Sequence, residues 1–323
     1  MAWLELSIDA THEAIDWVCT LLSATDCTGD VHIMNPIEPD SHGLATQDKP
    51  HWDYTIRLYL PDDIHGSACA EKIDNLLSPL HRIGLTRALH LTVVEQKPAH
   101  AELYHPRTHR IGQRFIVLTP NAPYHPETAD EIPLRLGTTF SFGSGLHPAT
   151  MLSLRLLERY VAPGMNVLDL GSGSGILSVA IAKLGAHVLA LDNDRTAVQA
   201  TQDAVNQNGV KQQVTVMEGS LGQGSSLGHW MGLDTIDNVP TIDATATFDL
   251  IVANILARIH IALAEDLQRA LRCTDHRVGL LITAGFTVDY QDEVAMALGK
   301  AGFEAIDCER LNEWVAFAHR LKS

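Results

Sequence analysis

The chain has 323 residues, more than a single hydrophobic core usually accommodates, so its length predicts two domains. A hydrophobic content of 46% is sufficient for sizeable cores. The net charge of −16 argues against a protein that binds nucleic acid directly by neutralising its phosphates. An acidic surface would instead attract a basic protein, although acidity also serves plain solubility.

Targeting, membrane and metal patterns are missing from the sequence. The start, Met-Ala-Trp-Leu-Glu-Leu, lacks the basic and apolar regions of a signal peptide. No apolar run approaches the roughly 18 residues of a membrane-spanning helix. The five cysteines include no C-x-x-C pair, and the 17 histidines include no H-E-x-x-H arrangement. We therefore expect a cytoplasmic protein with reduced thiols, no bound metal and no membrane contact.

Residues 1–95 are predicted to form a small α+β domain. Alternating apolar residues indicate strands, and apolar residues at helical spacing indicate helices. The expected elements are the strand 3–8, the helix 11–22, the strands 31–37 and 54–60, the helix 68–80 and the strand 89–93. This order is that of the ferredoxin-like split unit. Because the segment has no catalytic motif, we assign it to substrate recognition, with structural support alone as the alternative.

Residues 96–131 are predicted to be a linker that contains one strand, at 114–118. Prolines are dense there and disfavour regular structure. They are Pro98, Pro106, Pro120, Pro123 and Pro126. The second domain is expected to span residues 132–323.

The second domain is predicted to be an α/β fold. Expected strands are 167–170, 189–192, 214–217, 248–254 and 279–283, expected helices are 195–208, 258–271 and 291–299, and the closing hairpin is 304–310 with 314–320. Five mostly parallel strands and a terminal hairpin give a Rossmann-like sheet of seven strands. The stretch 219–247 is long for an α/β connection. It is either a mobile insertion near the site or a solvent-exposed excursion with no role.

A glycine-rich turn is the most informative segment of the chain. It reads Val167-Leu-Asp-Leu-Gly-Ser-Gly-Ser-Gly175, and the following strand ends at Asp192, which lies 21 positions after Gly171. This spacing brings Asp192 to the carboxyl end of the neighbouring strand, where it can accept hydrogen bonds from ribose hydroxyls. Gly171 and Gly173 let the backbone approach a ligand that any Cβ would push away. A tight turn without a ligand is the alternative.

The same turn narrows the class of ligand. A dinucleotide site needs G-x-G-x-x-G, but position 176 is Ile, and no G-x-x-x-x-G-K-[ST] run exists for a triphosphate. Asp169 is out of place facing a pyrophosphate and suits a cationic or zwitterionic ligand. The D-x-G-x-G-x-G pattern resembles the first motif of the S-adenosylmethionine methyltransferases, and Asp192 resembles their ribose-binding acid.

Two further segments should meet this turn at the carboxyl ends of the strands. Asn254 follows an apolar strand, and it could orient an attacking amine or merely cap the strand. Residues 139–150 form a glycine-bearing loop that enters a helix at Pro148, and Thr150 adds a hydroxyl to the free N–H groups there. His147 could accept a proton or simply pack in the loop.

With these segments the chain resembles the PrmA family, which methylates the large-subunit ribosomal protein L11. The matching segments are Phe142-Gly-Ser-Gly-Leu-His-Pro-Ala-Thr150, Asp169–Gly175, Asp192-Asn-Asp194, Val252-Ala-Asn-Ile-Leu-Ala257 and Glu313-Trp-Val-Ala316. The resemblance implies S-adenosylmethionine as cofactor, with Thr150, Gly171, Asp192 and Asn254 in contact with it. It also implies methylation of lysine or other amino groups on a basic ribosomal protein.

This chain departs from the family at Leu146 and Ala149, where the family has threonines. Two other functions therefore stay open. The same chemistry could act on another protein or on a small amine, or the chain could bind the cofactor without catalysis.

Overall fold

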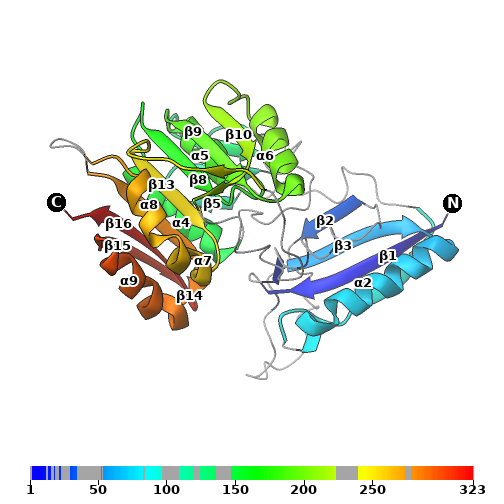
Figure 1. Cartoon of the computed structure of the whole chain (residues 1–323). Helices are drawn as coiled ribbons and strands as arrows, with labels where there is room; N and C mark the ends of the chain where they lie inside the picture. The colour runs from blue at the N-terminus through cyan, green and yellow to red at the C-terminus, as the bar shows by residue number, and fades with distance from the viewer. Residues whose placement is uncertain are drawn as a thin grey trace, which may run out of the picture. The chain divides into compact units, whose positions relative to one another are not determined.

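The structure, a computed structural model, divides into two compact units, residues 1–107 with 140–142 and residues 108–139 with 143–323 (Figure 1). Each unit has its own hydrophobic core. The residues that the structure describes are 2–11, 14–15, 18, 22, 30–34, 52, 54–82, 84–96, 109–118, 124–135, 147–222, 239–273 and 278–322.

The first unit contains a four-stranded antiparallel sheet in the order β2-β3-β1-β4. Its elements are β1 (Trp3–Ala10), β2 (Asp30–Met34), β3 (Tyr54–Pro61), α2 (Ile64–Arg82) and β4 (His90–Val94). Ala14, Ile15, Val18 and Leu22 are helical. Leu4, Leu6 and Ile8 alternate with less buried residues along β1 and pack with Ile73 and Leu77 of α2. The elements therefore follow the predicted order of strand, helix, two strands, helix and strand.

The cysteines differ from expectation at one position. Cys69 on α2 is disulfide-bonded, with a partner outside the described residues, so the prediction of reduced thiols is wrong there. Cys273 and Cys308 are free and exposed. No helix in the described part of the chain is long and apolar enough to cross a membrane.

The second unit is built on a seven-stranded sheet in the order β10-β9-β8-β13-β14-β16-β15. The strands are β8 (Asn166–Leu170), β9 (His187–Asp192), β10 (Val214–Glu218), β13 (Leu250–Asn254), β14 (Leu280–Thr287), β15 (Phe303–Leu311) and β16 (Trp314–Leu321). The first five strands in the sheet order are parallel, and β16 runs antiparallel to both neighbours. The predicted α/β sheet with a terminal hairpin is confirmed.

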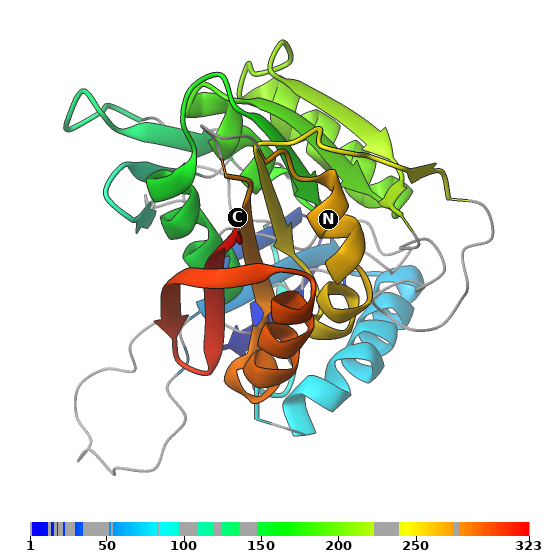
Figure 2. The same cartoon turned by 60° about the vertical axis from the view of Figure 1, so that its left-hand side comes forward.

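Helices cover both faces of this sheet. One core contains residues of α4 (Pro148–Tyr160), α5 (Ile176–Lys183) and α6 (Arg195–Gln207), and the other contains residues of α7 (Ala257–Ala262), α8 (Ala264–Ala270) and α9 (Gln291–Lys300). Along β13, Leu250 and Val252 face the first core, while Ile251 and Ala253 face the second. Figure 2 shows α7, α8 and α9 together, in gold and orange, on one side of the sheet.

Two elements of this unit differ from the sequence prediction. The helix expected at 258–271 is two short helices, because Leu263 leaves the helical conformation at φ −96° and ψ 6°. Strand β14 extends to Thr287 and contains a register shift between Thr283 and Phe286, where Gly285 has φ 90°.

Part of the predicted linker belongs to the second unit. β5 (His109–Ile111), β6 (Phe115–Leu118) and β7 (Ile132–Arg135) form a three-stranded sheet there. Glu158 of α4 accepts hydrogen bonds from the backbone N–H groups of Gln113 and Arg114 at 2.9 and 2.7 Å. The second unit therefore begins before residue 132.

The long connection at 219–247 is described only at its ends. β11 (Ser220–Leu221) pairs in parallel with β12 (Thr241–Ile242). Residues 223–238 lie outside the described residues, so the alternatives for this insertion stay open.

Candidate active site

The glycine-rich loop after β8 has a backbone that other residues would not adopt easily. Gly171, Gly173 and Gly175 have φ of 77°, 53° and 78°, in the left-handed region. A Cβ on Gly171 would lie 2.6 Å from Cγ2 of Ile255, and one on Gly175 would lie 2.8 Å from Cα of Thr201. The loop therefore requires glycine for both conformation and packing.

Asp192 connects this loop to the start of α6. Its Oδ2 accepts a hydrogen bond from Gly173 N at 2.8 Å, and its Oδ1 accepts one from Asp194 N at 3.0 Å. A carboxylate has about four acceptor positions, so each oxygen can also accept from a ligand hydroxyl. The side chain is half-buried at the carboxyl end of β9, where the sequence predicted a ribose-binding acid.

Thr201 of α6 is a further support of the loop that the sequence analysis did not identify as functional. Its buried Oγ1 donates to the Gly173 carbonyl at 3.0 Å and lies 2.9 Å from Oγ of Ser172. A hydroxyl on the inward face of α6, the helix that follows Asp192, was the available indication. Its hydrogen bonds fix the loop at the residue whose N–H also contacts Asp192.

Asp169 lies fully buried behind the loop. Its Oδ2 accepts a hydrogen bond from Oγ of Ser178 at 2.6 Å, and its Oδ1 has no hydrogen-bond partner among the described residues. Burial raises the pKa of this carboxyl to about 7, the Ser178 hydrogen bond opposes the rise, and the nearby charge of Asp192 adds to it. A buried carboxyl with an open oxygen favours a positively charged ligand beside it.

Asn254 ends β13 and contacts Thr150 in the first turn of α4. Its Nδ2 donates to Oγ1 of Thr150 at 3.3 Å. Its Oδ1 is buried and has no hydrogen-bond partner in the described structure, so it can accept from a ligand. Because Nδ2 is held by Thr150, the orientation of the amide is set before any ligand binds.

His147 is the N-cap of α4. Its Nδ1 accepts from Ala149 N at 3.2 Å, and its ring meets Trp314 edge-on at 4.4 Å between centroids. The side chain is fully buried. These contacts favour packing and capping over proton transfer.

The residues predicted from the sequence meet at one edge of the sheet. β8 pairs with β13, with Leu170 opposite Ala253, so Gly171 and Asn254 follow directly from paired positions. The glycine loop, Asp169, Asp192, Asn254 and Thr150 therefore share the carboxyl ends of the strands, where open α/β sheets bind ligands.

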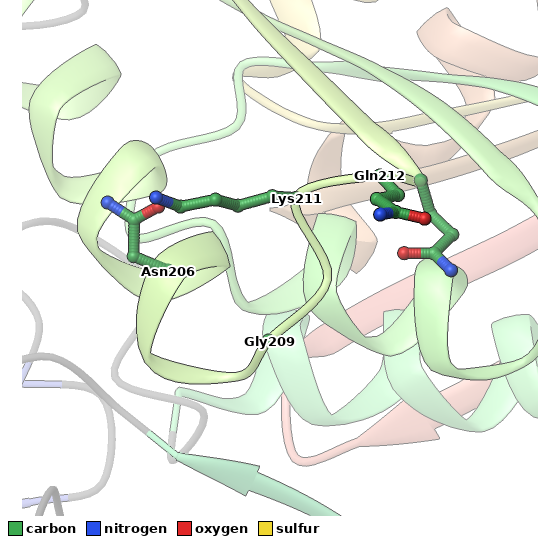
Figure 3. Close-up of a pocket in the computed structure, with 5 residues that line it drawn as sticks. Asn206, Gly209, Lys211 and Gln212 are labelled. Carbon is green, nitrogen blue, oxygen red and sulfur yellow. The ribbon is translucent and has the colours of Figure 1, made fainter.

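A pocket of the second unit lies at the opposite end of the strands. It has a volume of about 260 Å³, lies between the end of α6 and the start of β10, and is lined by Asn206, Gly209, Lys211, Gln212 and Gln213, with Lys211 extended beside Asn206 (Figure 3). No group of three or more metal-ligating side chains occurs among the residues that the structure describes. The carboxyl edge is thus the better candidate for the active site.

The substitution Asp169→Asn should remove a pH dependence of stability. The folded-state pKa of about 7 lies above the ordinary aspartate value of 3.8, so between these pH values the folded state holds a proton that the unfolded state has released. Two buried histidines, His260 and His319, have pKa values lowered to about 4, so they make stability rise with pH over part of this range. The difference between the two proteins isolates Asp169: the unfolding free energy of the natural protein minus that of Asp169→Asn should fall as pH rises from about 4 to about 7, by of the order of 1 kcal/mol per pH unit, and then level off.

Urea unfolding at several pH values measures both curves. Asp289→Asn, which changes an exposed carboxyl, is the matched control and should follow the natural protein. Parallel curves for the natural protein and Asp169→Asn would contradict the raised pKa.

Comparison with known proteins gives one consistent result. A family model described as ribosomal protein L11 methyltransferase (PrmA) matches residues 2–322. The chain is 39% identical over 328 residues to the ribosomal protein L11 methyltransferase of Chloroflexus aurantiacus, covering 99% of this chain and 98% of that protein. The corresponding protein of Herpetosiphon aurantiacus is 36% identical over 324 residues, with 99% of each chain covered. The solved ribosomal protein L11 methylase of Lactobacillus delbrueckii subsp. bulgaricus matches with a TM-score of 0.54 and 28% identity, covering 68% of this chain and 100% of that one. The resemblance noted from the motifs is confirmed, and the chain belongs to the PrmA family of ribosomal protein L11 methyltransferases.

Proposed function

We propose that the protein transfers methyl groups from S-adenosylmethionine to lysine side chains or other amino groups of ribosomal protein L11. The observation that carries this proposal is the buried Oδ1 of Asn254, which lacks a partner among the described residues and lies beside the glycine loop. An amine N–H is a suitable donor to such an oxygen. The choice of L11 as substrate rests on family membership, since the relatives are named as L11 methyltransferases.

The chain's residues fit the cofactor. Asp192 would accept hydrogen bonds from the ribose hydroxyls, and Gly171 and Gly173 would let the backbone approach the ligand. Asp169 places a carboxyl behind the loop, where positive charge on the ligand favours its ionised form. Bound S-adenosylmethionine supplies a methyl group already activated by its sulfonium.

Positioning is what the protein adds to this chemistry. The attacking amine must be neutral, and a lysine in water has a pKa near 10.4. A desolvated site beside a positive charge lowers the pKa of that amine. Oδ1 of Asn254 then accepts an N–H and directs the nitrogen lone pair, while Thr150 holds the amide from the other side. Nitrogen gains the methyl as the sulfur–carbon bond breaks, and the amine releases a proton to solvent. Correct alignment supplies much of the acceleration.

Substrate recognition belongs in this proposal to residues 1–95. They have no catalytic motif, and the candidate active site lies entirely in the second unit. The net charge of −16 suits a basic ribosomal protein. The protein would work in the cytoplasm on this partner, without direct binding of nucleic acid.

Purified protein, labelled S-adenosylmethionine and free L11 should give labelled L11, and mass spectrometry should place the methyl groups on amino groups. A variant lacking residues 1–95 should bind the cofactor nearly as well and leave L11 unlabelled. Labelling of another protein or a small amine in a lysate, with L11 unlabelled, would show that L11 is not the substrate. Binding without labelling of anything would indicate a non-catalytic protein.

Asp192→Ala should weaken S-adenosylmethionine binding by about ten-fold or more, because charge-assisted hydrogen bonds to the ribose are lost. Titration calorimetry measures the affinity. Asp192→Asn keeps the shape of the side chain and one acceptor oxygen, so its affinity for S-adenosylmethionine should lie between that of the natural protein and that of Asp192→Ala. A folded Asp192→Ala variant with full affinity would rule out the ribose contact.

Asn254→Ala should lower turnover by about a hundred-fold or more, about 3 kcal/mol in the barrier, with little change in melting temperature. Thr150→Val removes only the hydroxyl that holds the amide, so its turnover should fall less. Single-turnover rates and melting temperatures from the same preparation test this. Reduced stability with unchanged turnover would make Asn254 a strand cap.

A further inference from the structure

Two residues after Asn254, Ile255 and His260, form hydrogen bonds with the same backbone carbonyl of β14, that of Ala284. Ile255 N donates to the Ala284 carbonyl at 3.1 Å, and Nε2 of His260 lies 3.0 Å from the same oxygen. A carbonyl oxygen only accepts, so Nε2 of His260 must carry the hydrogen. Both lone pairs of this oxygen are therefore used, one by Ile255 directly after β13 and one by His260 of α7.

Gly285, the next residue of β14, packs against the corner formed by Ile255 and the Ala284 carbonyl. A Cβ on Gly285 would lie 2.5, 2.7 and 2.9 Å from the carbonyl oxygen, the nitrogen and the carbonyl carbon of Ile255. On its other side, Ile255 reaches Gly171, where a Cβ would lie 2.6 Å from its Cγ2. Ile255, which directly follows Asn254, therefore packs between the glycine loop and the register shift of β14 at Gly285.

His260 is a polar ring in apolar surroundings. It is fully buried, and its ring meets Phe286 edge-on at 5.4 Å between centroids. Burial lowers the pKa of His260 to about 4, against the opposing effect of the Ala284 and Ile255 carbonyls, so the ring is neutral near pH 7. An apolar side chain of similar size would pack there at a lower desolvation cost. What the imidazole adds is a directed N–H.

We propose that His260 is a positioning residue for methyl transfer, because its N–H fixes the Ala284 carbonyl that holds Ile255 and thereby sets the place of the Asn254 amide. The proposal rests on the proposed function of Asn254. Without the His260 hydrogen bond, Ala284 keeps its bond to Ile255 N, so no buried carbonyl is left unsatisfied. The corner loses a constraint, while the packing around it is retained.

His260→Leu should therefore lower kcat for L11 methylation by about ten-fold, because small displacements of aligned groups are costly to rate. The affinity for S-adenosylmethionine and the KM for L11 should change less than about two-fold, because none of their contacts is removed. His260→Gln should restore most of kcat, since its amide can place an N–H close to that of Nε2.

His319→Leu is the matched control. His319 is a second buried imidazole, whose Nε2 lies 3.1 Å from Oγ1 of Thr283, so it contacts a side chain of β14 and not the Ala284 carbonyl. Its loss should lower the melting temperature and leave kcat per folded molecule unchanged. A kcat that falls equally in both Leu variants, without recovery in His260→Gln, would overturn the positioning role.

Amide hydrogen exchange tests the corner without reference to activity. In His260→Leu the Ile255 amide should exchange about ten-fold faster than in the natural protein, with protection restored in His260→Gln and kept in His319→Leu. Unchanged protection in His260→Leu would overturn the inference even if the natural protein methylates L11. If the natural protein leaves L11 unmethylated, the proposed function fails, and the role of His260 in positioning for methyl transfer fails with it. Faster exchange would then support only the corner itself.

Discussion

Ile255 approaches the glycine loop so closely that no side chain fits at position 171. This contact joins the two parts of the candidate active site, the loop after β8 and the polar residue at the end of β13. It is possible only because β8 and β13 are neighbours in the sheet and end at the same level. A strand between them, or a register shift, would separate Asn254 from Gly171. The position of Asn254 relative to the loop therefore depends on this contact and on the strand order that permits it.

Electrostatics gives the same edge a preference for cations. Two carboxyl groups, Asp169 and Asp192, lie close enough for the charge of one to raise the pKa of the other. Backbone N–H groups of two residues stabilise the charge of Asp192, whereas the hydroxyl and backbone of Ser178 alone oppose the effect of full burial on Asp169. The cost of ionising Asp169 falls when a positive charge is placed nearby. A sulfonium or an ammonium group can provide that charge, and a pyrophosphate cannot.

The features that could be predicted from the sequence have local causes. Left-handed backbone at Gly171 and Gly173 can be inferred from glycine itself, and the alternation of apolar residues gives the strands. The convergence of Asn254 with the loop follows from the rule that parallel strands end at one edge. The break at Leu263 could not be inferred in this way, because the apolar spacing continues through it. Within the predicted linker the strand expected at 114–118 is confirmed as β6, but the short strand β5 was obscured, because proline density indicates irregular chain even where Glu158 ties a turn to a helix.

His260 and Thr201 show why the rest of the site escaped prediction. Each is one polar residue on a helix, and nothing in its immediate sequence names the backbone group that it contacts. The partner of His260 is the Ala284 carbonyl, 24 positions along the chain, and that of Thr201 is the Gly173 carbonyl, 28 positions away. Such contacts exist only once the sheet has assembled, so they depend on tertiary structure and leave no periodic pattern. Both act on backbone carbonyls next to the groups expected to bind ligand. Binding residues and their supports are consequently encoded differently, the first in short motifs and the second in the packing of helices against the sheet.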